Sequence, residues 1–188
     1  MIVLMAGLPA TGKSTLCGAL ALKLGGSILD KDIVRASLFS RTEIEYSTAQ
    51  DDFCAKIMLE AAAFTLQQNP RRMIFLDGRP FSRRYQIDQA IAAVEILKQP
   101  WHILECVCSS ESARKRLSEQ SDGGLHLAGN RDYKLYERVK SEFEPITLPK
   151  TVIDTDRPIE ECVALASSVL MGDRPQRHSD EMPSTSRN

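Results

Sequence analysis

Four residues near the start of the chain have the types and the spacing needed to bind phosphate. The stretch GLPATGKS fits the pattern G-x-x-x-x-G-K-[ST], whose fixed positions are Gly7, Gly12, Lys13 and Ser14. Glycines let backbone N–H groups approach phosphate oxygens, and a helix that follows the loop adds its positive N-terminal end. We therefore predict a nucleoside triphosphate site in which Lys13 reaches the outer phosphates and Ser14 binds Mg²⁺. The residues expected to hold the nucleotide are Gly7, Leu8, Pro9, Ala10, Thr11, Gly12, Lys13, Ser14 and Thr15.

Acidic residues and an arginine lie close together in the stretch LDKDIVRASLF. An aspartate followed three residues later by an arginine, on the first turn of a helix, offers a proton acceptor and a cation that holds a substrate. We expect Asp32 to be the base that takes the proton of an acceptor hydroxyl, and Arg35 to anchor the substrate. The alternative is structural, because Asp30 or Asp32 can instead serve only to cap the helix.

A further aspartate, Asp77, ends the apolar run MIFLD. An acidic group at this position orders the Mg²⁺ shell, either directly or through water. The chain then turns toward Arg83 and Arg84. These two arginines either contact substrate or begin a solvated helix, and the second interpretation is the one favoured here.

These groups need a sheet that brings the ends of its strands together. Short apolar runs alternate with longer stretches of helical period, which is typical of a parallel sheet covered by helices on both faces. We therefore predict an α/β three-layer sandwich with a five-stranded parallel sheet, whose ligands bind at the carboxyl ends of the strands. The expected strands span residues 1–6, 27–29, 73–77, 102–108 and 151–154, and the expected helices span 13–24, 50–68 and 84–98, with a last one after Pro158.

Apolar residues at helical spacing support the predicted helices. On the helix expected over residues 50–68, the predicted apolar stripe consists of Phe53, Ile57, Ala61 and Phe64. On the helix over residues 84–98, the stripe consists of Ile87, Ile91, Val94 and Leu97.

Two segments interrupt this alternation. Residues 118–131, SEQSDGGLHLAGNR, are polar and glycine-rich and lie between helical patterns, as expected of a lid that closes over a bound nucleotide. Beside this lid, we expect Arg116 to lie on the nucleotide base and Arg131 to reach the phosphates. Residues 172–188 lack apolar periodicity and are predicted to form a disordered tail, which leaves residues 1–171 as one domain.

Composition argues against several classes of protein. The chain has 188 residues, 43% hydrophobic and 26% charged, as in an ordinary globular protein. Its net charge of −1 gives no electrostatic footprint for long nucleic acid. No apolar run approaches a membrane span, and we expect a cytoplasmic location. The five cysteines lack metal-binding spacing, so we expect reduced thiols in the core.

Together, the motifs GLPATGKST, DKDIVR, FLDGR, RKRL and FEPI…VIDTDRPIEE resemble those of the small P-loop kinases. That group includes chloramphenicol phosphotransferase, gluconate-kinase-like enzymes, zeta-toxin-like kinases and the kinase domain of polynucleotide 5′-hydroxyl kinases. The resemblance implies a P-loop kinase domain over residues 1–171 with a small lid, Asp32 as base and Arg35 as substrate contact. It also implies that the nucleotide base lies between the region of Arg116 and the loop that follows VIDT, at Thr155.

The chain departs from this group before the lid. Many relatives carry a second arginine in the pattern R-L-x-x-R, and Gln120 occupies that position here. The sequence leaves open whether Arg131 or Lys134 supplies the missing charge.

The predicted activity is an ATP- and Mg²⁺-dependent transfer of the γ-phosphoryl group to a hydroxyl of a small molecule, either a metabolite or an antibiotic. One alternative is a polynucleotide 5′-hydroxyl kinase, against which the near-neutral charge and few aromatic residues count. The other is a switch or ATPase that transfers the group only to water. Residues 36–52 and 78–86 are expected to line the acceptor pocket. The acceptor, the choice of nucleoside triphosphate and the oligomeric state are left open.

Overall fold

A computed structural model describes residues 1–123 and 133–172 of the chain. Its centre is one five-stranded sheet with the strand order β2-β3-β1-β4-β5, in which every pair of neighbours is parallel. The predicted five-stranded parallel sheet is thus confirmed. The strands are β1 (Ile2–Ala6), β2 (Ser27–Asp30), β3 (Ile74–Asp77), β4 (Trp101–Val107) and β5 (Thr151–Asp154).

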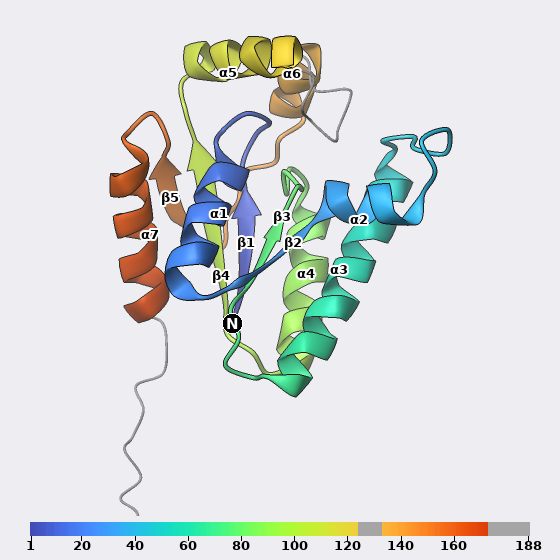
Figure 1. The fold of residues 1–188 in the computed structure, drawn as a ribbon, viewed down its shortest axis with the longest axis vertical. Helices are drawn as coiled ribbons and strands as arrows, with labels where there is room; N and C mark the ends of the chain where they lie inside the picture. Colours follow the sequence, from blue (N-terminus) through green and yellow to red (C-terminus); the bar gives the residue numbers. More distant parts are fainter. Residues whose placement is uncertain (124–132, 173–188) are drawn as a thin grey trace, which may run out of the picture.

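Helices cover both faces of this sheet and one of its ends (Figure 1). Helices α1 and α7 pack on one face and α3 and α4 on the other, while α5 and α6 lie across the carboxyl ends of the strands. Among the described residues, none of the helices has both the length and the apolar character needed to cross a bilayer. The helices are α1 (Lys13–Leu24), α2 (Lys31–Leu38), α3 (Thr48–Gln68), α4 (Arg84–Ile96), α5 (Ser110–Gly123), α6 (Tyr133–Ser141) and α7 (Ile159–Gly172).

The central strand explains why this layered arrangement forms. All five residues of β1 are buried, because the strand is covered on both faces and hydrogen-bonds to β3 and β4 at its edges. Alternate side chains of β1 enter two separate cores. Val3 and Met5 pack with α1 and α7, and Ile2 and Leu4 pack with α3 and α4.

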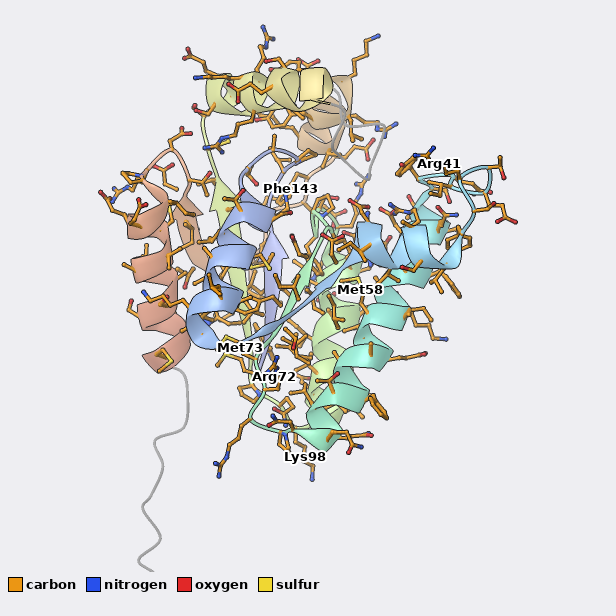
Figure 2. The ribbon with its side chains drawn as sticks, viewed as in Figure 1. Arg41, Met58, Arg72, Met73, Lys98 and Phe143 are labelled. Carbon is orange, nitrogen blue, oxygen red and sulfur yellow. The ribbon has the colours of Figure 1, made fainter. Side chains whose placement is uncertain are left out.

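The apolar stripe predicted for α3 is wrong, because the buried face of the helix lies beside the predicted one. Its buried positions are spaced four apart, at Gln50, Cys54, Met58, Ala62 and Leu66. Phe53 and Phe64 are exposed, and the ring of Phe53 packs edge-on against Phe39 of the α2 end. Figure 2 labels Met58 on α3, and its side chain belongs to the core between this helix and the sheet. Apolar residues occur on several faces of α3, so the sequence periodicity did not identify the buried one. On α4 the predicted stripe is confirmed.

The first residues of the predicted lid and of the predicted tail belong to helices. Residues 118–123 belong to α5, so this part of the predicted lid is helical, and residues 124–131 lie outside the described residues. Gly172 is the last residue of α7, and residues 173–188 of the predicted tail also lie outside the described residues.

Candidate functional site

A cleft of about 1200 Å³ lies at the carboxyl ends of the strands. It exceeds the 300–1000 Å³ typical of a site for one small ligand, so it has room for a nucleotide and a second molecule. Predicted residues from separate parts of the sequence meet in this cleft, among them Lys13, Ser14, Asp32, Arg35, Arg116 and Thr155. Residues of segments 36–52 and 78–86 also line it, among them Tyr46, Asp51 and Tyr85.

The glycine loop that precedes α1 encloses the lysine side chain. Gly7 and Gly12 have φ angles of 128° and 77°, which glycine adopts without the strain that a Cβ would cause. A Cβ at Gly7 would also overlap the carbonyl oxygen of Cys106 on β4. Nζ of Lys13 donates hydrogen bonds to the carbonyl oxygens of Gly7 at 2.8 Å and Leu8 at 2.6 Å. The backbone is thus folded closely around the cation expected to meet phosphate.

The predicted loop residues divide into two groups. Those that line the cleft are Pro9, Ala10, Gly12, Lys13, Ser14 and Thr15, whereas Gly7, Leu8 and Thr11 are not among its lining residues. Thr11 is buried, and its hydroxyl donates to the carbonyl oxygen of Leu8 at 2.8 Å. Leu8 packs against an apolar cluster that includes Tyr136 of α6. Residues of this second group therefore stabilise the conformation of the loop without lining the cleft.

Arg116 on α5 joins three elements at the nucleotide end of the cleft. Its guanidinium donates to the hydroxyl of Thr155 at 3.1 Å, to the carbonyl oxygen of Thr155 at 2.7 Å and to that of Ala10 at 3.3 Å. The Thr155 hydroxyl in turn donates to the carbonyl oxygen of Thr11 at 2.9 Å. Helix α5 and the loop after β5 are thereby fastened to the phosphate loop. The position of Arg116 on a nucleotide base stays a prediction.

Four charged residues form a cluster on the opposite wall of the cleft. Asp32 and Arg35 are 7% and 2% exposed, and the Arg35 guanidinium donates to Asp32 Oδ1 at 2.6 Å. The other terminal nitrogen of Arg35 pairs with Asp51 on α3, and the ring of Tyr46 lies 5.0 Å from the guanidinium. Lys31 pairs with Asp51 at 2.8 Å and lies 3.9 Å from Asp32. The cluster contains two cations and two carboxylates, so its charges balance.

In this cluster, two residues differ from the prediction made for them. Arg35, expected to hold substrate, is committed through both terminal nitrogens to carboxylates of the protein. Asp51 was not among the predicted site residues, although it falls within the segment expected to line the acceptor pocket. Its only sequence signal is an acidic residue in the first turn of a helix, which ordinarily indicates interaction with the helix dipole.

The two aspartates at the start of α2 have different roles. Asp30 is the N-cap, because its Oδ1 accepts hydrogen bonds from the backbone N–H groups of Asp32 at 2.7 Å and Ile33 at 3.0 Å. Burial, with a further contribution from the negative charge of Asp77, raises the pKa of Asp30 above its ordinary value. Asp32 lies inside the first turn, where its carboxylate faces Arg35 and not the helix end. The capping interpretation therefore holds for Asp30 and leaves Asp32 available for chemistry.

Asp77 lies beneath the cleft at the end of β3. It is 2% exposed, and within the described part of the chain its Oδ1 is buried without a hydrogen-bond partner. The segment that follows is tied to the phosphate loop, because the N–H of Gly7 donates to the carbonyl oxygen of Pro80 at 3.0 Å. A buried carboxylate oxygen with no donor suits a hard cation such as Mg²⁺, which prefers oxygen ligands. Asp77 thus suits the expected metal by its chemistry, although it is not among the residues that line the cleft, whereas Ser14 is. That the two residues together bind Mg²⁺ stays a prediction.

The predicted lid cations divide between described and undescribed parts of the chain. Arg131 lies outside the described residues. Lys134 is exposed on α6 and is not among the residues that line the cleft, whereas Arg138, one turn later, does line it. Arg83 lines the cleft and pairs with Glu142 at 2.6 Å. Arg84 is largely exposed and pairs only loosely with Asp88 of its own helix, as expected of a solvated helix start.

Comparison with known proteins identifies a family for this chain. The model of the AAA_33 family, described as an AAA domain, matches residues 2–146, which is more than half of the chain. No curated protein sequence matches the chain.

Several solved structures share the fold. A proposed kinase from Chloroflexus aurantiacus has a TM-score of 0.70 at 21% identity, over 91% of this chain and 96% of that one. The APS kinase CysC of Mycobacterium tuberculosis, in complex with AMPPNP and APS, has a TM-score of 0.68 at 17% identity, over 90% and 96%. Kti12 of Chaetomium thermophilum, in complex with ADP-AlF3, has a TM-score of 0.67 at 15% identity, over 91% and 98%.

At these identities the likeness shows the fold alone, and it is the P-loop fold that the glycine loop indicated. The family match rests on the sequence and includes the loop, the charged cluster and Asp77. The chain therefore belongs to the AAA_33 family of P-loop proteins.

Proposed function

We propose that this protein is a kinase that transfers the γ-phosphoryl group of ATP, with Mg²⁺, to a hydroxyl group of a small molecule. The observation that carries the proposal is that one cleft is lined by both Lys13 of the phosphate loop and Asp32 of the charged cluster. A site that only bound nucleotide would need the first and not the second. The solved neighbours named as kinases support this assignment, since their acceptors are small molecules where a title names one.

In this proposal, each charged group has a separate task. As the acceptor oxygen forms its bond to the γ-phosphorus, its proton passes to the Asp32 carboxylate and the bond to the β,γ-bridging oxygen breaks. Arg35 acts through its ion pair, which orients the Asp32 carboxylate toward the cleft. Lys13 neutralises charge on the outer phosphates. Ser14 and Asp77 would hold Mg²⁺, which supplies further charge neutralisation when bound.

A second candidate function is nucleotide hydrolysis without an acceptor. It is favoured by the pairing inside the charged cluster, because both terminal nitrogens of Arg35 are already bound to carboxylates of the protein and are not left to hold an acceptor molecule. It is also consistent with the likeness to Kti12, which was solved with ADP-AlF3. In this case the cluster would be a support for α2 and α3.

The experiment that separates the two functions measures ADP release with and without candidate acceptors. Purified protein is incubated with ATP and Mg²⁺ and with sugars, sugar acids, nucleosides, amino alcohols and aminoglycoside or phenicol antibiotics in turn. We expect at least one alcohol to accelerate ADP release and to appear as a phosphate ester in the ³¹P NMR spectrum. An ADP release that no acceptor changes, and that Lys13→Ala removes, supports hydrolysis instead. A DNA or RNA 5′-hydroxyl oligonucleotide in the same panel tests the polynucleotide alternative.

A further inference from the structure

A second cavity lies between α3 and α4, next to the transfer cleft, with which it shares the lining residue Gln86. Its volume is about 430 Å³, within the range of a site for a small ligand. The side chains of Met58 and Leu59 from α3, Leu76 and Phe81 from the sheet side, and Ala90 from α4 make its walls largely apolar. Figure 1 shows the two helices side by side on the same face of the sheet, and Figure 2 labels Met58 on α3.

One buried cation also lines this apolar cavity. Arg79, just after β3, is 3% exposed, and one of its terminal nitrogens pairs with Asp52 on α3. Its Nε is buried and has no hydrogen-bond partner within residues 1–123 and 133–172. A buried N–H without an acceptor is costly, and a guanidinium has five N–H donors that a single carboxylate does not satisfy. Arg79 can therefore take a further acceptor from a ligand.

The charged groups around the cavity show which donor is left for a ligand. The cations that line it are Arg79 and Lys56, and the one lining carboxylate among the described residues is that of Asp52. Asp52 is itself engaged by Arg79 and by the hydroxyl of Tyr85, at 3.2 Å and 3.3 Å from its two oxygens. Lys56 is largely exposed and pairs with Glu60 at 3.9 Å, so the buried cation of the cavity is Arg79. The polar group left over is its Nε–H, which favours a ligand that carries a hydrogen-bond acceptor over a cationic one.

We propose that this cavity is a second binding site, which takes a small aromatic carboxylate. The apolar ring lies against Met58, Leu59 and Phe81, and the carboxylate accepts the Nε–H of Arg79. A hydrogen bond between a guanidinium and a carboxylate is charge-assisted and therefore stronger than one to a neutral acceptor. The site is separate from the phosphate loop, so its occupation needs neither nucleotide nor the proposed transfer activity.

The test follows the methyl resonance of Met58 in protein labelled with ¹³C-methyl methionine, the resonance being assigned with Met58→Leu. Phenylacetate, 3-phenylpropanoate and benzoate are titrated, and phenylacetamide and acetate are the neutral and ringless controls. We expect a saturable shift with at least one of the aromatic carboxylates. We expect binding of the neutral amide to be about tenfold weaker, because it lacks the charge-assisted hydrogen bond. Arg79→Gln is expected to abolish that preference.

Two variants block the cavity and one serves as a matched control. Ala55→Phe fills it from α3, and Gln89→Trp covers it from the exposed face of α4, where a larger side chain is tolerated. Ala63→Phe makes the same change two turns along α3, at a residue equally half-buried that does not line the cavity. Binding should be lost with the first two variants and kept with the third.

Three results would overturn the proposal. They are the absence of saturable binding of every aromatic carboxylate to the wild-type protein, equal affinity for the amide and the acid, and binding that survives both Ala55→Phe and Gln89→Trp. Lys13→Ala provides the separation from the proposed function, because carboxylate binding should be unchanged in that variant whether or not the protein transfers phosphate.

Discussion

Replacing Asp32 by asparagine tests the proposed base most directly. The side chain keeps its size and one oxygen that can accept the hydrogen bond from Arg35, but it loses the charge that takes a proton. Because Asp30 caps α2 through its own Oδ1, the start of the helix is untouched. The change therefore isolates the carboxylate of Asp32 from its structural surroundings.

The geometry allows two effects of this substitution to be estimated, one on the free energy of unfolding and one on the rate of transfer. The Arg35–Asp32 pair is buried, with side-chain exposures of 2% and 8%, so loss of the charge weakens a charge-assisted hydrogen bond to a neutral one. This costs about 1–2 kcal/mol of unfolding free energy, below the 3–5 kcal/mol expected if the partner were removed outright. Loss of a positioned proton acceptor reduces the rate of transfer by roughly a hundredfold or more. The activity effect thus exceeds what partial unfolding can produce.

The matched control is Asp51→Asn, which removes the other carboxylate that pairs with Arg35. Unfolding free energy is measured by urea denaturation, nucleotide affinity by titration calorimetry, and transfer by acceptor-dependent ADP release. We expect a similar loss of stability in both variants, nucleotide affinity close to that of the wild type, and a much smaller loss of transfer for Asp51→Asn. Asp30→Asn, which keeps the cap, should transfer at the wild-type rate.

Two results would refute this reasoning. Equal loss of transfer in Asp32→Asn and Asp51→Asn would mean that the cluster acts only as a unit that positions other groups. Normal transfer by Asp32→Asn would mean that the base lies elsewhere, with Asp77 the next residue to test.

Further expected outcomes concern the loop, a buried thiol and the helix cap. Lys13→Ala should keep the circular dichroism spectrum and lose nucleotide affinity and turnover, because the charge at the outer phosphates is gone. Gly7→Ala should lower the melting temperature and abolish nucleotide binding in the same titration, since its Cβ would overlap the Cys106 carbonyl oxygen. Burial raises the pKa of Cys106 to about 12, so this thiol should stay unreactive toward Ellman's reagent at pH 8 until the protein is unfolded. Burial also raises the pKa of Asp30, so the folded state holds that proton more tightly and stability falls as pH rises above the ordinary value near 3.8. Asp30→Asn should therefore be at least as stable as the wild type at pH 7 in urea denaturation, with the difference shrinking as the pH is lowered toward 4.

Local patterns were enough to predict the scaffold. The ends of the five strands were predicted to within one residue, because each strand is a short apolar run bounded by turns, and α1 was predicted to its ends by the glycines that flank it. The phosphate loop could also be predicted from the sequence, since its motif is defined by spacing within eight residues. The buried face of α3 was not, because its apolar residues surround the helix and the choice among them is made by packing against β3 and α4.

The contacts that shape the candidate sites depend on pairs distant in sequence. Asp51 and Asp52 are adjacent near the start of α3, yet they pair with arginines of different elements, Arg35 on α2 and Arg79 after β3. Neighbours on a helix point about 100° apart, so one turn can support the wall of the transfer cleft with one carboxylate and the second cavity with the other. Neither partner is visible in the local pattern AQDD, which by itself indicates only a favourable helix start. The three-dimensional arrangement therefore adds a physical link between the two sites, through a helical turn that both share.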